Sequence, residues 1–105
     1  MTIAVLIHED IHHVTEIELD INPAKNEVFK VLGGPPTFIG QWPVIDVVIM
    51  KSTITETTNS NSLPKPFHKE DLMGKILLIR MDTDSEPQDF TLEEYLRFIK
   101  ETSSE

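Results

Sequence analysis

The chain has 105 residues, a formal net charge of −9, no cysteine and a hydrophobic fraction of 39%. This length and composition are typical of one domain with one modest core, and no apolar run reaches the roughly 18 residues that cross a bilayer. The charge opposes binding to nucleic acid and to anionic membranes, and the lack of cysteine excludes disulfides and thiolate chemistry, so we expect a cytoplasmic or nuclear protein.

A β-hairpin is predicted at the start of the chain, in the sequence TIAVLIHEDIHHVTEIELDI. Its strands would cover about residues 2–8 and 13–20, joined by the short loop EDIH. In the second strand Thr15, Ile17 and Leu19 alternate with acidic residues, which indicates one buried and one solvated face.

A helix follows, and the sequence marks both its start and its end. Asn22 is a good N-cap, Pro23 suits the first helical position, and Gly33 stands where a left-handed C-cap is expected. Pro35 then prevents the helix from continuing. The side chains expected to face the core are Ala24, Val28, Val31 and Leu32.

Two apolar runs further along the chain predict buried strands, one over VIDVVIM (44–50) and one over about residues 75–81 of GKILLIRMD. Between them, about residues 52–66 predict a flexible polar loop that begins as a continuation of the strand. Its alternating Thr53 and Thr55 favour β-structure, so both a monomer and a homodimer paired through this edge remain open.

A second helix is predicted to begin at Thr91. Glu94, three residues later, completes a capping box with Thr91, while Phe90 and Tyr95 occupy the positions of a hydrophobic staple. Residues 102–105 are expected to fray. The expected buried stripe of this helix consists of Leu92, Tyr95, Leu96 and Ile99.

These elements give the order β-β-α-β-β-α, an α+β fold that forms a single domain over residues 1–105. About residues 1–34 resemble the ubiquitin-like β-grasp in the order and length of their elements. The resemblance implies a β-grasp-like mixed sheet, to which the C-terminal helix is an addition. The chain ends in ETSSE and not in the diglycine tail of a conjugated modifier, so the resemblance implies a fold and not conjugation.

A second resemblance covers more of the chain. The segments PTFIGQW, DVVIM, LPKPF, GKILLIRMD and PQDFTLEEYLRF are similar to a small family of unknown function found in algae and their large DNA viruses. Membership would imply a small stand-alone soluble protein, and it assigns no catalytic residue here.

The segment LGGPPTFIGQWP (32–43) combines glycines and prolines with the only tryptophan. A phosphate-binding loop needs glycines before a helix, whereas Gly33 and Gly34 follow one and precede two prolines without N–H donors. Trp42 has two interpretations, because it could cap the core or anchor a partner. In the second case the candidate partner-binding residues are Phe38, Gln41, Trp42 and Phe67.

Three histidines, His8, His12 and His13, lie in the first hairpin with Glu9 and Asp10 between them. His8 and His13 could face each other across the hairpin, while His12 would point elsewhere. A metal centre needs three or four converging ligands, so this pair is only a weak candidate and we expect neither a bound metal nor a cofactor.

The segment 82–94 carries six carboxylates and no basic residue. Asp82 and Asp84 fit the first positions of an EF-hand loop and are weak cation candidates, but Pro87 occupies the position that requires glycine. A solvated acidic loop and a docking patch for a basic partner are the other interpretations.

Asp46 and Arg80 each interrupt an apolar run that is predicted to be a buried strand. Because an unpaired buried charge is costly, a cross-strand ion pair between these two residues is one arrangement that would satisfy both.

No set of residues converges on a catalytic chemistry, so the leading hypothesis is a non-enzymatic protein-interaction or regulatory module. Two alternatives are kept: a small metal-dependent enzyme that uses the His8/His12/His13 hairpin, and an acidic mimic of nucleic acid. The expected partner is a protein, and neither nucleic acid nor a membrane.

Overall fold

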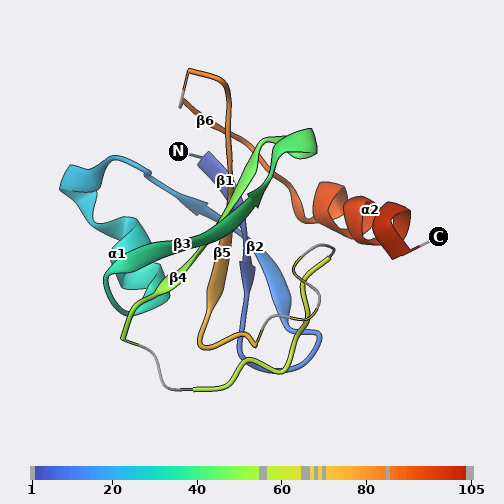
Figure 1. The fold of residues 1–105 in the computed structure, drawn as a ribbon. Coiled ribbons are helices and arrows are strands. Elements are labelled where there is room, and N and C mark those ends of the chain that lie inside the picture. The colour runs from blue at the N-terminus through green and yellow to red at the C-terminus, as the bar shows by residue number, and fades with distance from the viewer. Residues whose placement is uncertain are drawn as a thin grey trace.

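A six-stranded sheet forms the centre of the computed structural model (Figure 1), which describes residues 2–54, 57–64, 67, 69, 71–84 and 86–103. The strand order is β2-β1-β5-β4-β3, and the short β6 pairs with the end of β5. The elements are β1 (Thr2–Ile7), β2 (Val14–Leu19), the 3-10 turn η1 (Pro23–Lys25), α1 (Glu27–Leu32), β3 (Pro36–Trp42), the 3-10 turn η2 (Pro43–Ile45), β4 (Val47–Ser52), β5 (Ile76–Met81), β6 (Pro87–Gln88) and α2 (Leu92–Ser103).

The predicted α+β class is confirmed, whereas the predicted mixed sheet is wrong. All five strand pairs among the described residues are antiparallel. A parallel pair needs a crossover between neighbouring strands, but α1 connects β2 to β3, which lie at opposite edges of the sheet. This topology does not confirm the resemblance to the β-grasp.

The strand β3 was not predicted, because the prolines at its ends and Gly40 within it are typical of loops. Pro36 and Pro43 lie at its two ends, where the missing N–H groups do not interrupt the ladder. The chain then turns through η2 and Asp46, whose φ of 55° is left-handed, and β4 begins at Val47. VIDVVIM is therefore a turn followed by a strand, and Asp46 belongs to the turn.

The first helix is shorter than predicted. Asn22 Oδ1 accepts the N–H of Ala24 at 3.0 Å, as expected of a cap, but the turn that it starts ends at Asn26, whose φ of 55° interrupts the helix. Only the six residues of α1 follow before Gly33 closes the helix with a φ of 77° and an N–H bond to the Phe29 carbonyl. The C-cap at Gly33 is confirmed, while exposed Ala24 is not a core residue.

Two cores, rather than the single one expected from composition, lie on opposite faces of the sheet, and one helix lies on each side (Figure 1). Residues Ile76–Ile79 of β5 have no exposed surface, because alternate side chains enter the two cores. The buried residues on the α2 face are Val5, Ile7, Trp42, Val47, Ile49, Leu63, Leu72, Ile76, Leu78, Phe90 and Tyr95. Those on the α1 face are Ala4, Leu6, Leu19, Leu32, Met50, Leu77 and Ile79.

The start of α2 is as predicted. The Thr91 N–H donates to Glu94 Oε1, and the Glu94 N–H donates to Thr91 Oγ1, each at 3.2 Å, which is the reciprocal pattern of a capping box. The buried stripe differs in one position. Leu96 is 54% exposed, and Phe98 packs in its place with its ring centroid 5.1 Å from that of Trp42.

Arg80 does not pair with Asp46, as the sequence had suggested, but connects β5 to α2. Its Nη1 lies 2.6 Å from Glu94 Oε2, its Nε donates to the Ile45 carbonyl, and its guanidinium lies 5.0 Å from the centroid of the Phe90 ring. Partial burial acts to raise the pKa of Glu94, but hydrogen bonds from Arg80 and Thr91 outweigh it and hold that pKa below its usual value.

The expected continuation of β4 beyond Ser52 is also wrong. In the described part of residues 53–75, the only bridge pairs Thr58 with Met73, and a homodimer stays a prediction. Asn61 organises this segment instead, because its Nδ2 donates to the carbonyls of His8 at 2.9 Å and Asp10 at 2.8 Å.

Some predictions fall partly outside the described residues. These include Thr55, Glu56, Lys65 and Pro66 of the predicted loop and Ser104 and Glu105 of the predicted tail, whereas α2 continues to Ser103. None of the helices in the described part of the chain is long and apolar enough to cross a membrane.

Replacing Arg80 by methionine should destabilise the fold, because it removes donors to the Ile45 and Asp89 carbonyls and leaves Glu94 without its cation. We expect a loss of about 1–3 kcal/mol in the free energy of unfolding, measured by chemical denaturation. Arg97→Met is the matched control, because Arg97 belongs to an exposed ion pair worth about 0–1 kcal/mol. Equal losses in both variants would contradict the connecting role of Arg80.

Candidate binding groove

The face of the sheet that carries α1 is only partly covered. A helix of six residues is about 9 Å long, whereas five strands spaced about 4.8 Å apart extend about 19 Å across the sheet. On the opposite face, α2 has twelve residues and the chain around Leu63 and Leu72 adds to the cover. α1 packs against the start of β3 and the end of β4, so the part of this face around the end of β3 and the start of β4 is left open.

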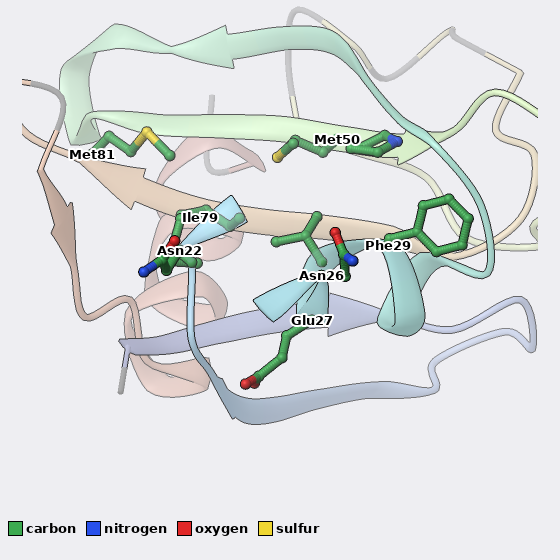
Figure 2. Close-up of a pocket in the computed structure, with 10 residues that line it drawn as sticks. Asn22, Asn26, Glu27, Phe29, Met50, Ile79 and Met81 are labelled. Carbon is green, nitrogen blue, oxygen red and sulfur yellow. The ribbon is translucent and has the colours of Figure 1, made fainter. Parts of the chain in front are cut away.

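A first pocket, of about 260 Å³, lies between α1 and the strands. Met81, Ile79 and Met50 lie along the strands in Figure 2, opposite the segment from Asn22 to Phe29. Val28 and Phe29 contribute apolar walls from α1, and Phe29 remains 47% exposed. The complete lining is Ile21, Asn22, Asn26, Glu27, Val28, Phe29, Pro36, Met50, Ile79 and Met81.

A second, wider hollow of about 540 Å³ adjoins the first, since Met81 lines both. Phe38 is 65% exposed at its rim, and Val48 lies on its floor strand β4. Its lining is Phe38, Gly40, Gln41, Pro43, Asp46, Val48, Met81 and Asp82. We call the two hollows together the α1-face groove.

The register of β3 decides which predicted partner-binding residues reach this groove. Phe38 lies opposite Met50 and Gln41 opposite Val48, so both face the α1 side. Trp42 lies opposite Val47, whose side chain enters the other core. A partner role for Phe38 and Gln41 stays a prediction. Both residues line the second hollow of the groove.

Trp42 and Phe67 lie on the α2 side of the sheet. Trp42 is 3% exposed, and its ring centroid lies 6.0 Å from that of Phe67 and 6.4 Å from that of Tyr95. A Cβ atom at position 40 would overlap the Phe67 ring, so Gly40 makes room for this cluster. Trp42 therefore packs as the core-capping interpretation expects, and it is not accessible as an anchor in this fold.

The histidine pair forms a stack and not an open site. The rings of His8 and His13 lie 3.9 Å apart at an interplanar angle of 13°, and His8 Nε2 lies 2.9 Å from Thr15 Oγ1. His12 adopts a left-handed φ of 62° in the turn. In the described part of the chain, no three His, Asp or Glu side chains lie close enough to hold a metal ion.

The two acidic candidates, Asp82 and Asp84, lie in the loop between β5 and β6. Asp82 Oδ1 accepts the N–H groups of Asp84 at 2.9 Å and Glu86 at 3.0 Å, and Oδ2 accepts from Gln88 at 3.1 Å. The hydrogen bond from Glu86, followed by those from Asp84 and Gln88, keeps the pKa of Asp82 below its usual value. Asp82 thus organises its own loop and also lines the groove.

Met50, Ile79 and Met81 were not predicted to be site residues. All three lie in apolar runs, which indicate burial on both faces of a sheet. The sequence nevertheless contained a signal for an exposed apolar face. Strands that are apolar on both faces need a cover on each face of the sheet, and for one face only the short chain around Val28 and Val31 could supply it.

Another hollow, of about 550 Å³, lies between α2 and the tip of the first hairpin. Ile11, at 62%, and Leu96, at 54%, are its most exposed apolar residues. Its walls include the irregular segment 60–62, whereas the α1-face groove is lined largely by strands and α1. Sites on regular elements hold their geometry better than sites on loops, so we place the candidate site in the α1-face groove.

The structure thus defines an α+β protein with an open apolar groove on one face of its sheet. The chain belongs to DUF5880, a family of unknown function, whose model matches residues 5–98 and so includes the whole groove. No curated protein and no solved structure is significantly similar to it. The predicted membership of a family of unknown function is confirmed, and an algal or viral source stays a prediction.

The histidine stack should make the stability depend on pH. Burial, followed by the charges of His13 and Lys75, lowers the pKa of His8, although Asp10 and Glu9 oppose the shift. The unfolded chain, with a pKa near 6.5, then binds more protons than the folded one, so stability should fall as the pH drops through about 6.5.

Melting temperatures measured across this pH range should change less steeply in His8→Gln than in the wild-type protein. His12→Asn is the control, because asparagine tolerates the left-handed backbone and His12 lies outside the stack. If His8→Gln keeps the full wild-type pH dependence, the stack is not its source.

Proposed function

We propose that this protein is a non-catalytic protein-interaction module that binds its partner in the α1-face groove. The observation that carries the proposal is the pair of adjoining hollows, floored by apolar strands and bordered by the exposed rings of Phe29 and Phe38. Contiguous apolar surface of this kind is characteristic of interaction sites, because exposing it to water costs free energy.

The first pocket, of about 260 Å³, has a size that suits one large side chain of a partner. Interface hot spots typically consist of one large side chain inserted into such a pocket, surrounded by shallower contacts. The wider second hollow supplies the shallower contacts.

The residues of the groove suit this role. Met50 and Met81 have flexible, polarizable side chains that adapt to the shape of an inserted group. Burying the exposed part of Phe38 and Phe29 would contribute roughly 1–2 kcal/mol each, as the two residues are 65% and 47% exposed.

An interaction module is preferred over a metal-dependent enzyme at the first hairpin. The His8 ring stacks on His13, and its Nε2 is already within hydrogen-bonding distance of Thr15. A metal bound by both histidines would require this stack to open, whereas the groove needs no rearrangement to accept a side chain.

The proposal predicts that Phe38→Ser weakens binding without destabilising the fold. Peptides are selected from a displayed random library against the wild-type protein, and their affinities are measured by fluorescence anisotropy. We expect the variant to bind them about tenfold more weakly, because a contact worth about 1–2 kcal/mol is lost.

Val44→Ser is the matched control. Val44 is 90% exposed in the η2 turn, so the substitution removes a similar exposed apolar group outside the lining of the groove. Peptides that bind wild type, Phe38→Ser and Val44→Ser equally well would show that the groove is not the binding site.

A further inference from the structure

We propose that the partner segment is basic as well as apolar: it inserts a large apolar side chain beside Met81 and places a Lys or Arg at the Asp46–Asp82 end of the groove. This inference rests on the proposed function and identifies the chemistry of the partner.

All charged residues among the described lining of the groove are acidic. They are Glu27 in the first pocket and Asp46 and Asp82 in the second. Glu27 is engaged, because its Oε1 accepts the N–H of Asp20 at 2.9 Å. Asp82 accepts hydrogen bonds from its own loop, but neither its carboxylate nor that of Asp46 has an ion-pair partner in the part of the chain that the structure describes.

The two aspartates lie together at one end of the groove. The Met81 N–H donates to the Asp46 carbonyl at 2.8 Å, and Asp82 is the next residue along the chain. Both line the same hollow as Phe38, and Met81 connects that hollow to the first pocket. A single segment of a partner can therefore fill the apolar pocket and reach the carboxylates.

The same charges oppose the other occupants of an apolar groove. A second copy of the chain would also carry a net charge of −9, and nucleic acid or an anionic membrane would bring further negative charge. A neutral apolar segment would partly desolvate the Asp46 and Asp82 carboxylates without bringing a charge of opposite sign, which costs free energy. A segment with a cation beside its apolar anchor avoids both penalties.

The charge can be removed without disturbing the backbone. Asparagine at 82 keeps an oxygen to accept the N–H groups of Asp84 and Glu86, and asparagine at 46 tolerates the left-handed φ of 55°. Asp46→Asn/Asp82→Asn is therefore the test variant. Asp71→Asn/Glu93→Gln, which removes the same charge at exposed positions outside the groove, is the control.

Random displayed peptides are selected in parallel against the wild type and both double variants, after thermal unfolding has shown all three to be folded. We expect the wild type and the control to enrich a large apolar residue with Lys or Arg nearby, and the test variant to keep the apolar preference but lose the basic one. A peptide selected on the wild type should bind the test variant about three- to tenfold more weakly, and the control within about twofold.

The outcomes separate this inference from the proposed function. Peptides that are apolar without an excess of Lys or Arg, but that lose affinity for Phe38→Ser, would overturn the basic partner and keep the groove. Peptides indifferent to Phe38→Ser would overturn both. A homodimer that Phe38→Ser dissociates in sedimentation experiments would make a second copy the occupant and also overturn the inference.

Discussion

A six-residue helix cannot cover one face of a five-stranded sheet, and the shape of this protein follows from that constraint. The strands β1, β5 and β4 are apolar on both faces, so each face needs a cover. Only α1 and the short turn before it lie on one face, because Asn26 separates that turn from α1 and Gly33 ends α1. The apolar surface that remains uncovered along β3, β4 and β5 is the α1-face groove.

The other face shows what a full cover involves. A twelve-residue helix is joined to the sheet by Arg80, whose guanidinium reaches Glu94, two backbone carbonyls and the face of Phe90. Aromatic residues around Trp42 fill the space beneath it. The sheet is thus packed against α2 on one face, and the same strands form the floor of the groove on the opposite face.

The hairpin, the buried strands, the C-cap at Gly33 and the capping box at Thr91 could all be predicted, because each depends on neighbouring residues in sequence. The strand β3 could not, since its prolines and its glycine are typical of loops and only pairing with β4 makes it a strand. The partner of Arg80 and the side of the sheet to which Trp42 points depend on tertiary register, which local pattern does not contain. The groove was not predicted for the same reason. It exists because α1 is too short to cover its face of the sheet, and the predicted helix was longer.

A bound peptide can be mapped on the protein by backbone amide chemical shifts. We expect the largest changes at Phe29, Phe38, Val48 and Met81, which come from three strands and α1 and meet only in the α1-face groove. Changes concentrated on α2 and around Ile11 would place binding in the hollow beside the first hairpin and would contradict the claim that the uncovered face of the sheet is the site.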